Sequence, residues 1–324
     1  MNTPILIYLA ACASALATTF ATLPLWRLWC LRIGLVDDPG HRKIHAVPVP
    51  LAGGLAVLTG LLVPLAGAVV LLKFNLLPMA SADALLYGLN KRALQLGAIA
   101  IGAVSMTILG VLDDQHELRP RTKFAGQFLI ALLVAAAGVR ITLFVPSVLF
   151  SYTVTILWLL TVINAFNFMD NMNGLCAGLG AIGAGWFAVI AGLDGQYLVA
   201  LIALLTCGAL VGFLPHNFPH ARAFLGDAGS HLVGYLLAVL AILPHFYHPQ
   251  DPRPLAVITP LLVLAVPLGD LVWVVLLRWR LGQPFYVGDT NHLSHRLVRA
   301  GWSRTTAVGL IWFAAAVVGG LALW

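Results

Sequence analysis

One acid lies between two glycines where an apolar run begins, in the stretch Phe224–Ser230. Glycines let the backbone turn tightly and come close to a ligand. We expect a helix to start at Ser230, so that backbone N–H groups of the turn face phosphate oxygens. The carboxylate of Asp227 suits Mg²⁺, which prefers oxygen ligands and shares them with phosphates. The alternative is a polar turn in which Ser230 only caps the helix.

Two adjacent acids, Asp113 and Asp114, end another apolar run and precede a basic loop that contains Lys123. The C-terminus of a helix carries partial negative charge, so acids there are disfavoured. A metal ion, a cationic partner or a role in proton transfer would offset that cost. The alternative is a solvated helix end.

A third cluster combines one acid with four amides: Asn164, Asn167, Asp170, Asn171 and Asn173. Residues 164, 167 and 171 recur at helical spacing, which predicts one amide-lined face. Amides and a carboxylate can coordinate a metal or bind the edge of a nucleobase. The alternative is hydrogen bonding between helices, a common use of Asn in membranes.

A fourth cluster lies near the C-terminus. If that segment is helical, Ser294 points elsewhere and one face carries Asp289, His292, His295 and Arg296. Imidazoles and a guanidinium together suit phosphate, whereas a zinc site lacks a third ligand at an obvious spacing. The alternative is an amphipathic helix at the membrane interface.

The first polar loop offers three further candidates for phosphate binding, Arg42, Lys43 and His45. Two prolines stiffen the chain that follows, and the Gly53-Gly54 pair permits close contact between helices. The alternative is a basic loop that only anchors the chain at the membrane surface.

The elements that must position these clusters are apolar. Of the 324 residues, 60% are hydrophobic and 9% are charged, against roughly 25% charged in soluble proteins. This composition predicts an all-α polytopic membrane protein, with a single domain over residues 1–324. Spans need about 20 apolar residues each. We count ten: Pro4–Trp26, Leu51–Leu72, Ala93–Leu112, Phe124–Val139, Leu149–Ala165, Leu175–Gly192, Tyr197–Leu214, His231–Phe246, Leu255–Leu277 and Thr305–Leu323.

The loops between these spans alternate sides, and one side holds 13 of the 18 Lys and Arg residues. This excess assigns that side to the cytoplasm. Nine of the 12 acids lie at the same face, which the rule for basic residues does not explain. A site that binds magnesium and phosphate would use both acidic and basic side chains. Asp270 lies inside a span, where acids are functional candidates, but it can equally hold a neighbouring helix, so we leave it outside the site.

Together the clusters resemble the polyprenyl-phosphate N-acetylhexosamine-1-phosphate transferases, the WecA/TagO/MraY type, and most of all the WecA/TagO-like branch. The resemblance runs from Asp38 to Arg304. The motifs occur in the family's order: Arg-Lys-x-His with Pro-x-Pro-x-x-Gly-Gly, Asp-Asp with a downstream Lys, Asn-x-x-Asn-x-x-Asp, Gly-Asp-x-Gly-Ser, and a His-containing last loop.

The resemblance implies ten or eleven helices around a cleft at the cytoplasmic face of the bacterial inner membrane. It implies Mg²⁺, with Mn²⁺ as an alternative, a UDP-N-acetylhexosamine donor (UDP-GlcNAc in the first place) and undecaprenyl or another polyprenyl phosphate. The lipid phosphate attacks the sugar-linked phosphorus and UMP leaves. This reaction initiates the synthesis of cell-surface polysaccharides, such as O-antigen and cell-wall polymers.

The resemblance also implies roles for individual residues. Asp227 is the expected principal Mg²⁺ ligand and Asn167 the second. Asp113 accepts or holds the proton of the lipid phosphate, and Asp114 assists. The expected substrate-binding residues are Arg42, Lys43, His45, Lys123, Asn164, Asp170, Asn173, His292, His295 and Arg296.

The chain departs from the family pattern at three positions. Asn171 replaces a glycine and Asn173 an acid in Asp-Gly-x-Asp-Gly, and Ser294 replaces a histidine in His-x-His-His. Because helical phase places Ser294 off the shared face, we expect its substitution to matter little. The departures bear on the identity of the sugar more than on the reaction class.

Two other functions compete with this one. A phospho-N-acetylmuramoyl-pentapeptide transferase is expected to carry adjacent histidines in its last loop, which this chain lacks. An ion-coupled transporter could use Asp113, Asp227 and Asp270 as a relay, but transporters tend to place acids near the midplane and to show repeated halves. The oligomeric state, monomer or homodimer, is left open, and no feature indicates nucleic acid binding.

Overall fold

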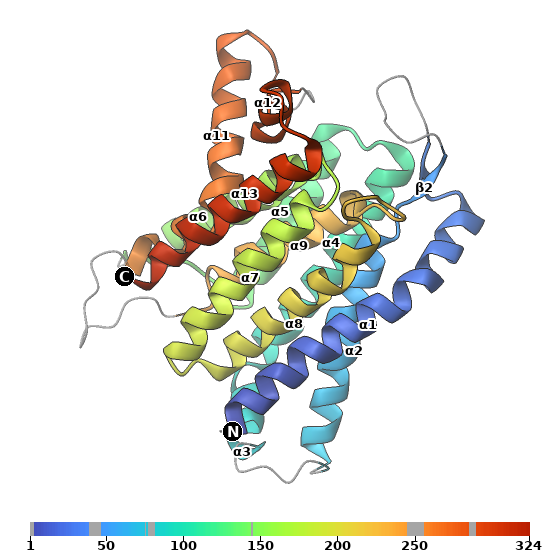
Figure 1. Ribbon diagram of the computed structural model, residues 1–324. Coiled ribbons are helices and arrows are strands. Elements are labelled where there is room, and N and C mark those ends of the chain that lie inside the picture. Colours follow the sequence, from blue (N-terminus) through green and yellow to red (C-terminus); the bar gives the residue numbers. More distant parts are fainter. Residues whose placement is uncertain are drawn as a thin grey trace.

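The computed structural model describes residues 3–38, 47–74, 76, 82–143, 145–244, 256–284 and 290–324. Within these residues the fold is almost entirely helical (Figure 1). The α-helices are α1 Thr3–Ile33, α2 Gly53–Lys73, α3 Ala82–Lys91, α4 Ala93–His116, α5 Pro120–Ala136, α6 Val148–Met169, α7 Leu175–Leu193, α8 Tyr197–Phe213, α9 Gly226–Leu240, α10 Thr259–Val263, α11 Ala265–Arg280, α12 Leu293–Arg299 and α13 Arg304–Gly320. Short 3-10 helices occupy Leu214–His216, Ala256–Ile258 and Leu321–Leu323.

The described residues contain one small antiparallel pair of strands, β1 (Val36–Asp37) and β2 (Val49–Pro50). The pair brings together the two ends of the first polar loop. The predicted phosphate binders Arg42, Lys43 and His45 lie in that loop, outside the described residues. Asp289 of the last loop lies outside them as well.

Seven of the described helices are long and apolar enough to cross a membrane: α1, α2, α4, α6, α7, α8 and α13. Their outer surfaces expose large apolar side chains, among them Leu25, Leu149 and Phe313. Exposed apolar surface on this scale marks a membrane or binding interface. The prediction of an all-α, multi-pass membrane protein is confirmed.

The three other predicted spans fall on shorter helices. α5 has 17 residues and α9 has 15. The span expected at Leu255–Leu277 is divided between a 3-10 turn, α10 and α11, so it is not one continuous helix as we expected. The short helix α3 has no counterpart among the ten predicted spans.

The core of the bundle is α9, which contacts α2, α4, α6, α7 and α8. Asp227 is the one residue of this helix that is not buried. The hydroxyl of Tyr235 donates to the carbonyl of Ile99 on α4 (3.0 Å), and the Trp158 indole of α6 donates to the carbonyl of Ala238 (3.1 Å). These bonds fix α9 between α4 and α6.

Two glycines let neighbouring helices approach the start of α9. A Cβ at Gly110 of α4 would collide with the backbone of Asp227 and Ala228, and a Cβ at Gly54 of α2 would collide with the backbone of Gly229. The expectation that the Gly-Gly pair permits close helix contact is confirmed. Because Gly110 lies one turn before Asp113, this contact also brings the acids of α4 to Asp227.

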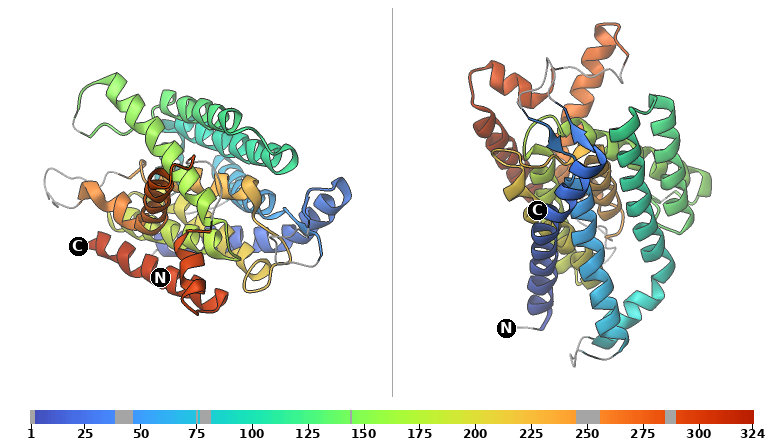
Figure 2. Two further views of the ribbon diagram at one scale, coloured as in Figure 1. Left: turned by 90° about the horizontal axis from the view of Figure 1, so that it is seen from above. Right: turned by 90° about the vertical axis from the view of Figure 1, so that its right-hand side faces the viewer.

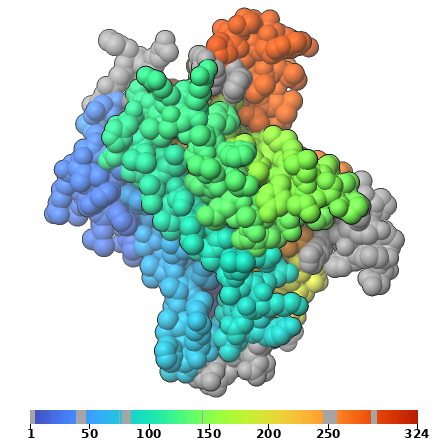
Figure 3. Space-filling view, turned by 180° about the vertical axis from the view of Figure 1, so that it is seen from behind, coloured from blue at the N-terminus to red at the C-terminus, as the bar shows by residue number. Residues whose placement is uncertain are grey.

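The polar elements gather at one end of the bundle. In Figures 1 and 2, α12 and the β1–β2 pair lie at the end opposite the N-terminus and α3. Figure 3 shows the end of α11 rising above the rest of the molecule at this same end. The candidate site lies here, among the ends of α4, α6, α9 and α12.

Candidate active site

The side chain of Asp114, from α4, caps the N-terminus of α9. Its Oδ1 accepts from the backbone N–H of Asp227 (2.8 Å), and its Oδ2 accepts from the N–H of Ala228 (3.1 Å). Gly226 has a φ of +70°, a conformation that glycine adopts without a steric penalty. A carboxylate at a helix N-terminus satisfies free N–H groups and is favoured by the helix dipole.

This cap corrects two expectations about the glycine-rich turn. The helix begins at Gly226, so Ser230 lies inside it, and neither the expected start nor the alternative Ser230 cap is present. The N–H groups of Asp227 and Ala228, in the turn that we expected to face phosphate, bind Asp114. Asp114 therefore acts on the helix start and positions Asp227.

Lys123, at the start of α5, joins the two acids assigned to the reaction. Its Nζ lies 2.6 Å from Asp113 Oδ2 and 3.2 Å from Asp227 Oδ2. The other oxygen of Asp113 accepts from the backbone N–H of Leu118 (2.9 Å). Asp113 is only 7% exposed, so water compensates little of its charge. The Lys123 ammonium and the N–H of Leu118 compensate it instead.

Asn167 of α6 completes this group. Its amide Nδ2 donates to Asp227 Oδ1 (2.5 Å) and to the hydroxyl of Ser230 (3.0 Å), while its Oδ1 faces Lys123 Nζ at 3.5 Å. Three side-chain oxygens, from Asp113, Asp227 and Asn167, thus converge on one positive charge. We call these residues, with Lys123, the acid cluster.

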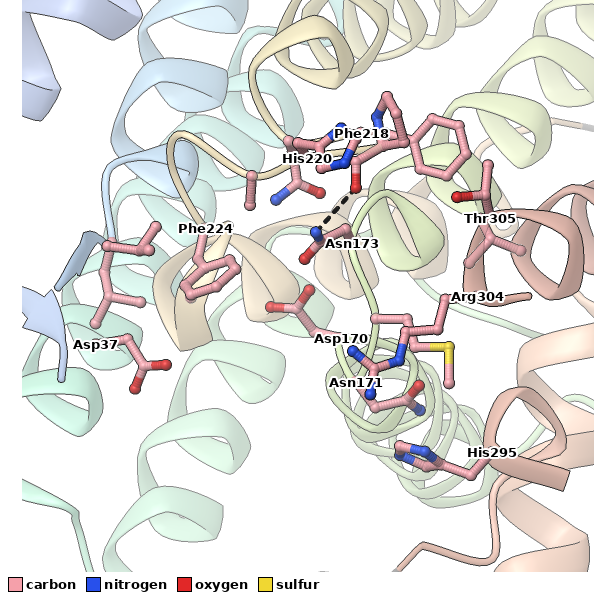
Figure 4. A pocket seen from close by; sticks show the side chains of 18 residues that line it. Asp37, Asp170, Asn171, Asn173, Phe218, His220, Phe224, His295, Arg304 and Thr305 are labelled. Carbon is pink, nitrogen blue, oxygen red and sulfur yellow. Dashed lines mark hydrogen bonds between the residues drawn. The ribbon is translucent and has the colours of Figure 1, made fainter. Parts of the chain in front are cut away.

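A pocket of about 690 Å³ adjoins the acid cluster at Gly226. In Figure 4, Asp170 lies between Asp37 on one wall and Arg304 with His295 on the other. The pocket is also lined by two aromatic rings and a histidine from the segment between α8 and α9: Phe218, His220 and Phe224. Its size lies within the roughly 300–1,000 Å³ of small-molecule sites.

The pocket is lined by one carboxyl and two amides of the third cluster, from Asp170, Asn171 and Asn173. Asp170 is the C-cap residue of α6; it is exposed to solvent and lines the pocket. Asn173 donates to the carbonyl of Pro219 (3.1 Å), which joins the chain after α6 to the segment between α8 and α9 (Figure 4).

In α12, His292 is held by an acid from α11. Its Nδ1 lies 2.6 Å from Asp270 Oδ2, and the N–H of Leu293 donates to Asp270 Oδ1 (2.6 Å). Because a carboxylate only accepts, the pair fixes the tautomer with the proton on Nδ1. His292 is the N-cap residue of α12 and is buried. Asp270 thereby orients the first histidine of the motif.

His295 faces the pocket, three residues further along α12. Burial, followed by the nearby His292 and the positive charges of Arg299 and Arg304, lowers the pKa of its imidazole below the ordinary value. Arg296 lies elsewhere: its guanidinium stacks on the ring of Trp273 in α11, 4.7 Å from the centroid. Of the three residues predicted to hold the diphosphate, His295 lines the pocket, while His292 and Arg296 pack against α11.

Known proteins match this chain over most of its length. The model of glycosyl transferase family 4 matches residues 96–245. A "decaprenyl-phosphate N-acetylglucosaminephosphotransferase" of Mycobacterium tuberculosis is 34% identical, over 96% of this chain and 80% of the relative. The chain belongs to glycosyl transferase family 4. A "probable undecaprenyl-phosphate N-acetylglucosaminyl 1-phosphate transferase" of Bacillus subtilis is 29% identical (92% and 79% covered), and an "undecaprenyl-phosphate alpha-N-acetylglucosaminyl 1-phosphate transferase" of Yersinia pestis is 27% identical (89% and 76% covered).

The membership confirms the family predicted from the four clusters. It also gives the departures from the family pattern a structural setting, because two of them touch. Ser294 of α12 donates to Asn171 Oδ1 (2.6 Å), and Asn171 Nδ2 donates to the carbonyl of Phe168 (2.6 Å). Ser294 is 1% exposed. The expectation that Ser294 points away from the site is wrong: α12 begins only at Leu293, and its first turn faces the end of α6.

The amide face predicted along α6 is only partly present in this family member. Asn164 donates to Gln127 Oε1 of α5 (2.8 Å) and to the carbonyl of Leu160 (2.8 Å), which is the alternative of hydrogen bonding between helices. Asn171 lies beyond Met169, the last residue of α6, so helical spacing does not apply to it. Asn167 alone joins the acid cluster.

Several residues of the site are absent from the set predicted from the sequence. Arg304 counted only as one more basic residue, and His220 lies in a turn that we did not single out. Asp270 lies inside a predicted span but outside the predicted site. His231 was treated as the first residue of a span, yet its ring lies against Asp113 and Asp227. For Asp270 and His231, the available sequence signal is that an acid or a histidine lies within a predicted membrane span.

Proposed function

We propose that this chain transfers N-acetylglucosamine 1-phosphate from UDP-N-acetylglucosamine to a polyprenyl phosphate, at the cytoplasmic face of a bacterial inner membrane. The observation that carries the proposal is the position of the 690 Å³ pocket directly beside the acid cluster. The names of the relatives supply the substrate classes. The product is a polyprenyl-diphosphate-linked sugar, which starts a cell-surface polysaccharide.

The donor is assigned to the pocket. Phe218 and Phe224 offer aromatic faces for the uracil ring, and stacking on such faces is a common mode of base binding. Arg304 and His295 line the other wall and suit the two phosphates, because a guanidinium binds phosphate oxygens in pairs. Asp170 and Asn173 supply a carboxyl and an amide for the polar edges of the donor.

The acceptor is assigned to the side of Lys123 and Asp113. The ammonium of Lys123 can exchange a carboxylate oxygen for a phosphate oxygen, because its four-carbon stem is flexible. Asp113 then loses part of its compensating charge and becomes a better proton acceptor for the lipid phosphate. The two residues thus hold the acceptor and take up its proton within the same step.

A divalent cation fits the oxygen donors of the acid cluster. Asp227, Asn167 and Asp113 already direct three oxygens at one positive charge, and Mg²⁺ takes an all-oxygen set of this kind. Asp227 and Asn167 are the residues that would hold it. Bound there, Mg²⁺ would neutralise charge on the diphosphate as the bond to UMP breaks.

The reaction needs positioning and charge compensation more than covalent help from the protein. An oxygen of the lipid phosphate forms a bond to the sugar-linked phosphorus. The bond from that phosphorus to the bridging oxygen breaks, and UMP leaves with this oxygen. Arg304 and His295 compensate the charge that develops on the donor side, and Lys123 holds the acceptor in line. Asp114 keeps Asp227 in place throughout by capping α9.

The test is UMP release by the purified protein with UDP-N-acetylglucosamine, undecaprenyl phosphate and Mg²⁺. We expect equal amounts of UMP and lipid-linked sugar, and near-complete loss of both in Asp227→Asn. Donors with other sugars, including UDP-N-acetylmuramoyl-pentapeptide, form the comparison set. Turnover of the pentapeptide donor alone would reassign the chain to peptidoglycan synthesis, and no turnover with any donor would overturn the proposal.

A further inference from the structure

His231 is a fully buried histidine of α9, at 0% exposure, and neither of its ring nitrogens has a hydrogen-bond partner among the described residues. It follows Asp227 by four residues, so both side chains lie on the same face of the helix. An imidazole buried without a partner is unfavourable, because its polar nitrogens lose their bonds to water. A ligand that binds one of these nitrogens would remove that cost.

Two carboxylates lie close to this ring. One donor atom each from Asp113, Asp227 and His231 lies within 4.8 Å of the others. Two atoms that bind one cation at about 2.0–2.2 Å each are at most about 4.4 Å apart. Asp227 and His231 must therefore close by a few tenths of an ångström at least to share one ion, and a third donor would have to move further, because three donors around one ion average at most about 3.8 Å apart.

We propose that His231 is a nitrogen ligand of the divalent cation that Asp227 binds. This inference rests on the proposed function, which places a cation at Asp227. It adds a ligand type that Mg²⁺ seldom takes and that Mn²⁺ and later transition metals accept readily. The cation preference of this chain is thereby shifted from Mg²⁺ toward Mn²⁺.

Lys123 and the cation occupy overlapping positions in this arrangement. The ammonium now bridges Asp113 and Asp227 at 2.6 and 3.2 Å. With a cation bound at Asp227, repulsion between like charges would release Lys123 from this carboxylate toward the lipid phosphate. The same event thus forms the metal site and frees the residue that holds the acceptor.

The test is pulsed electron paramagnetic resonance of the full-length protein in detergent, loaded with Mn²⁺. A histidine nitrogen bound to Mn²⁺ modulates the electron spin echo. We expect this modulation in the parental protein and its loss in His231→Leu. The matched control is His216→Gln, which removes another histidine whose Nε2 is buried without a partner among the described residues; the modulation must persist there.

Mn²⁺ affinity gives the second measurement. His231→Leu should weaken Mn²⁺ binding by at least about tenfold and leave the melting temperature unchanged or higher, because an unpaired buried polar group is removed. His231→Gln serves the same purpose if the leucine variant does not fold. The inference is overturned if the parental protein binds Mn²⁺ without showing the histidine modulation. It is also overturned if His231→Leu retains that modulation.

Activity separates this inference from the proposed function. UMP release with Mg²⁺ by the parental protein supports the transferase whatever the echo shows. If that activity is present and Mn²⁺ does not bind at all, the inference is wrong and the transferase stands. If UMP release is absent while the histidine modulation is present, the metal site stands and the reaction must be reassigned.

Discussion

The contact between Ser294 and Asn171 joins two positions at which this chain departs from its family. A change at either position alone should disturb the site, because the partner is left behind. Ser294→Ala removes the donor to Asn171 Oδ1, and Asn171→Gly removes the acceptor. Together with the double variant, they form a thermodynamic cycle for the one hydrogen bond.

The expected size follows from the surroundings of the two residues. A neutral hydrogen bond contributes about 1 kcal/mol, and an unsatisfied buried partner costs about 1–3 kcal/mol. Ser294 is 1% exposed, but Asn171 lines the pocket, where water reaches it. We therefore expect about 1 kcal/mol for each single variant, or roughly fivefold in kcat/KM for the UDP-sugar. The double variant should lose little more than either single one.

Restoring the family residues sharpens the test. Ser294→His places a larger side chain in a filled position, and overpacking of this kind costs about 1–3 kcal/mol. Asn171→Gly removes the side chain that faces it. The combination of Ser294→His with Asn171→Gly should therefore be more active than Ser294→His alone, although it carries one more substitution.

The assay is kcat/KM for the donor at saturating polyprenyl phosphate, with melting temperatures to show that each variant is folded. Ser294→Thr, which keeps the hydroxyl, is the matched control and should stay close to the parental rate. Full additivity in the cycle, with Ser294→Ala within twofold of the parental protein, would falsify the coupling.

Three further predictions concern the supports of the site. Gly110→Ala should lower stability by about 1–3 kcal/mol in thermal unfolding, because the new Cβ meets the backbone of Ala228; an unchanged melting temperature would contradict this. Asp270→Asn should reverse the tautomer of His292 and reduce kcat more than donor affinity, as NMR of the ring nitrogens can verify. Burial and the neighbouring cations lower the pKa of His295 below its ordinary value, so its ring gains charge only on acidification; donor KM should fall with falling pH, and His295→Gln should remove that trend.

The helices that cross the membrane follow from apolar length, which is a property of local sequence. The start of α9 cannot be predicted from local sequence, because the residue that caps it is distant in the chain. Ser230 has the right residue type for a local cap, and the groups that bind the first N–H donors belong to Asp114, 113 residues earlier. A search for caps within a few residues of the helix start could not find that partner.

The last loop was misjudged for a different physical reason. Helical phase was applied from Asp289 onward, but α12 begins at Leu293 and His292 is extended, with φ −61° and ψ 152°. A phase argument holds only inside one helix. Of the predicted face, His292 and His295 do lie near each other, with ring centroids 6.4 Å apart, whereas Arg296 turns to Trp273. Other predicted site residues do lie together. The fold brings into contact Asp113, Lys123, Asn167 and Asp227, all of which the sequence indicated.

The cap that Asp114 provides has a consequence for how the protein is assembled in the membrane. Before α4 and α9 meet, a carboxylate at the end of one and free N–H groups at the start of the other are each costly away from water. Their contact removes both costs at once, and in the finished fold α9 is packed against α2, α6, α7 and α8 as well. Completion of the bundle and formation of a usable site are therefore one event, and a half-inserted chain exposes no working acids to the substrates around it.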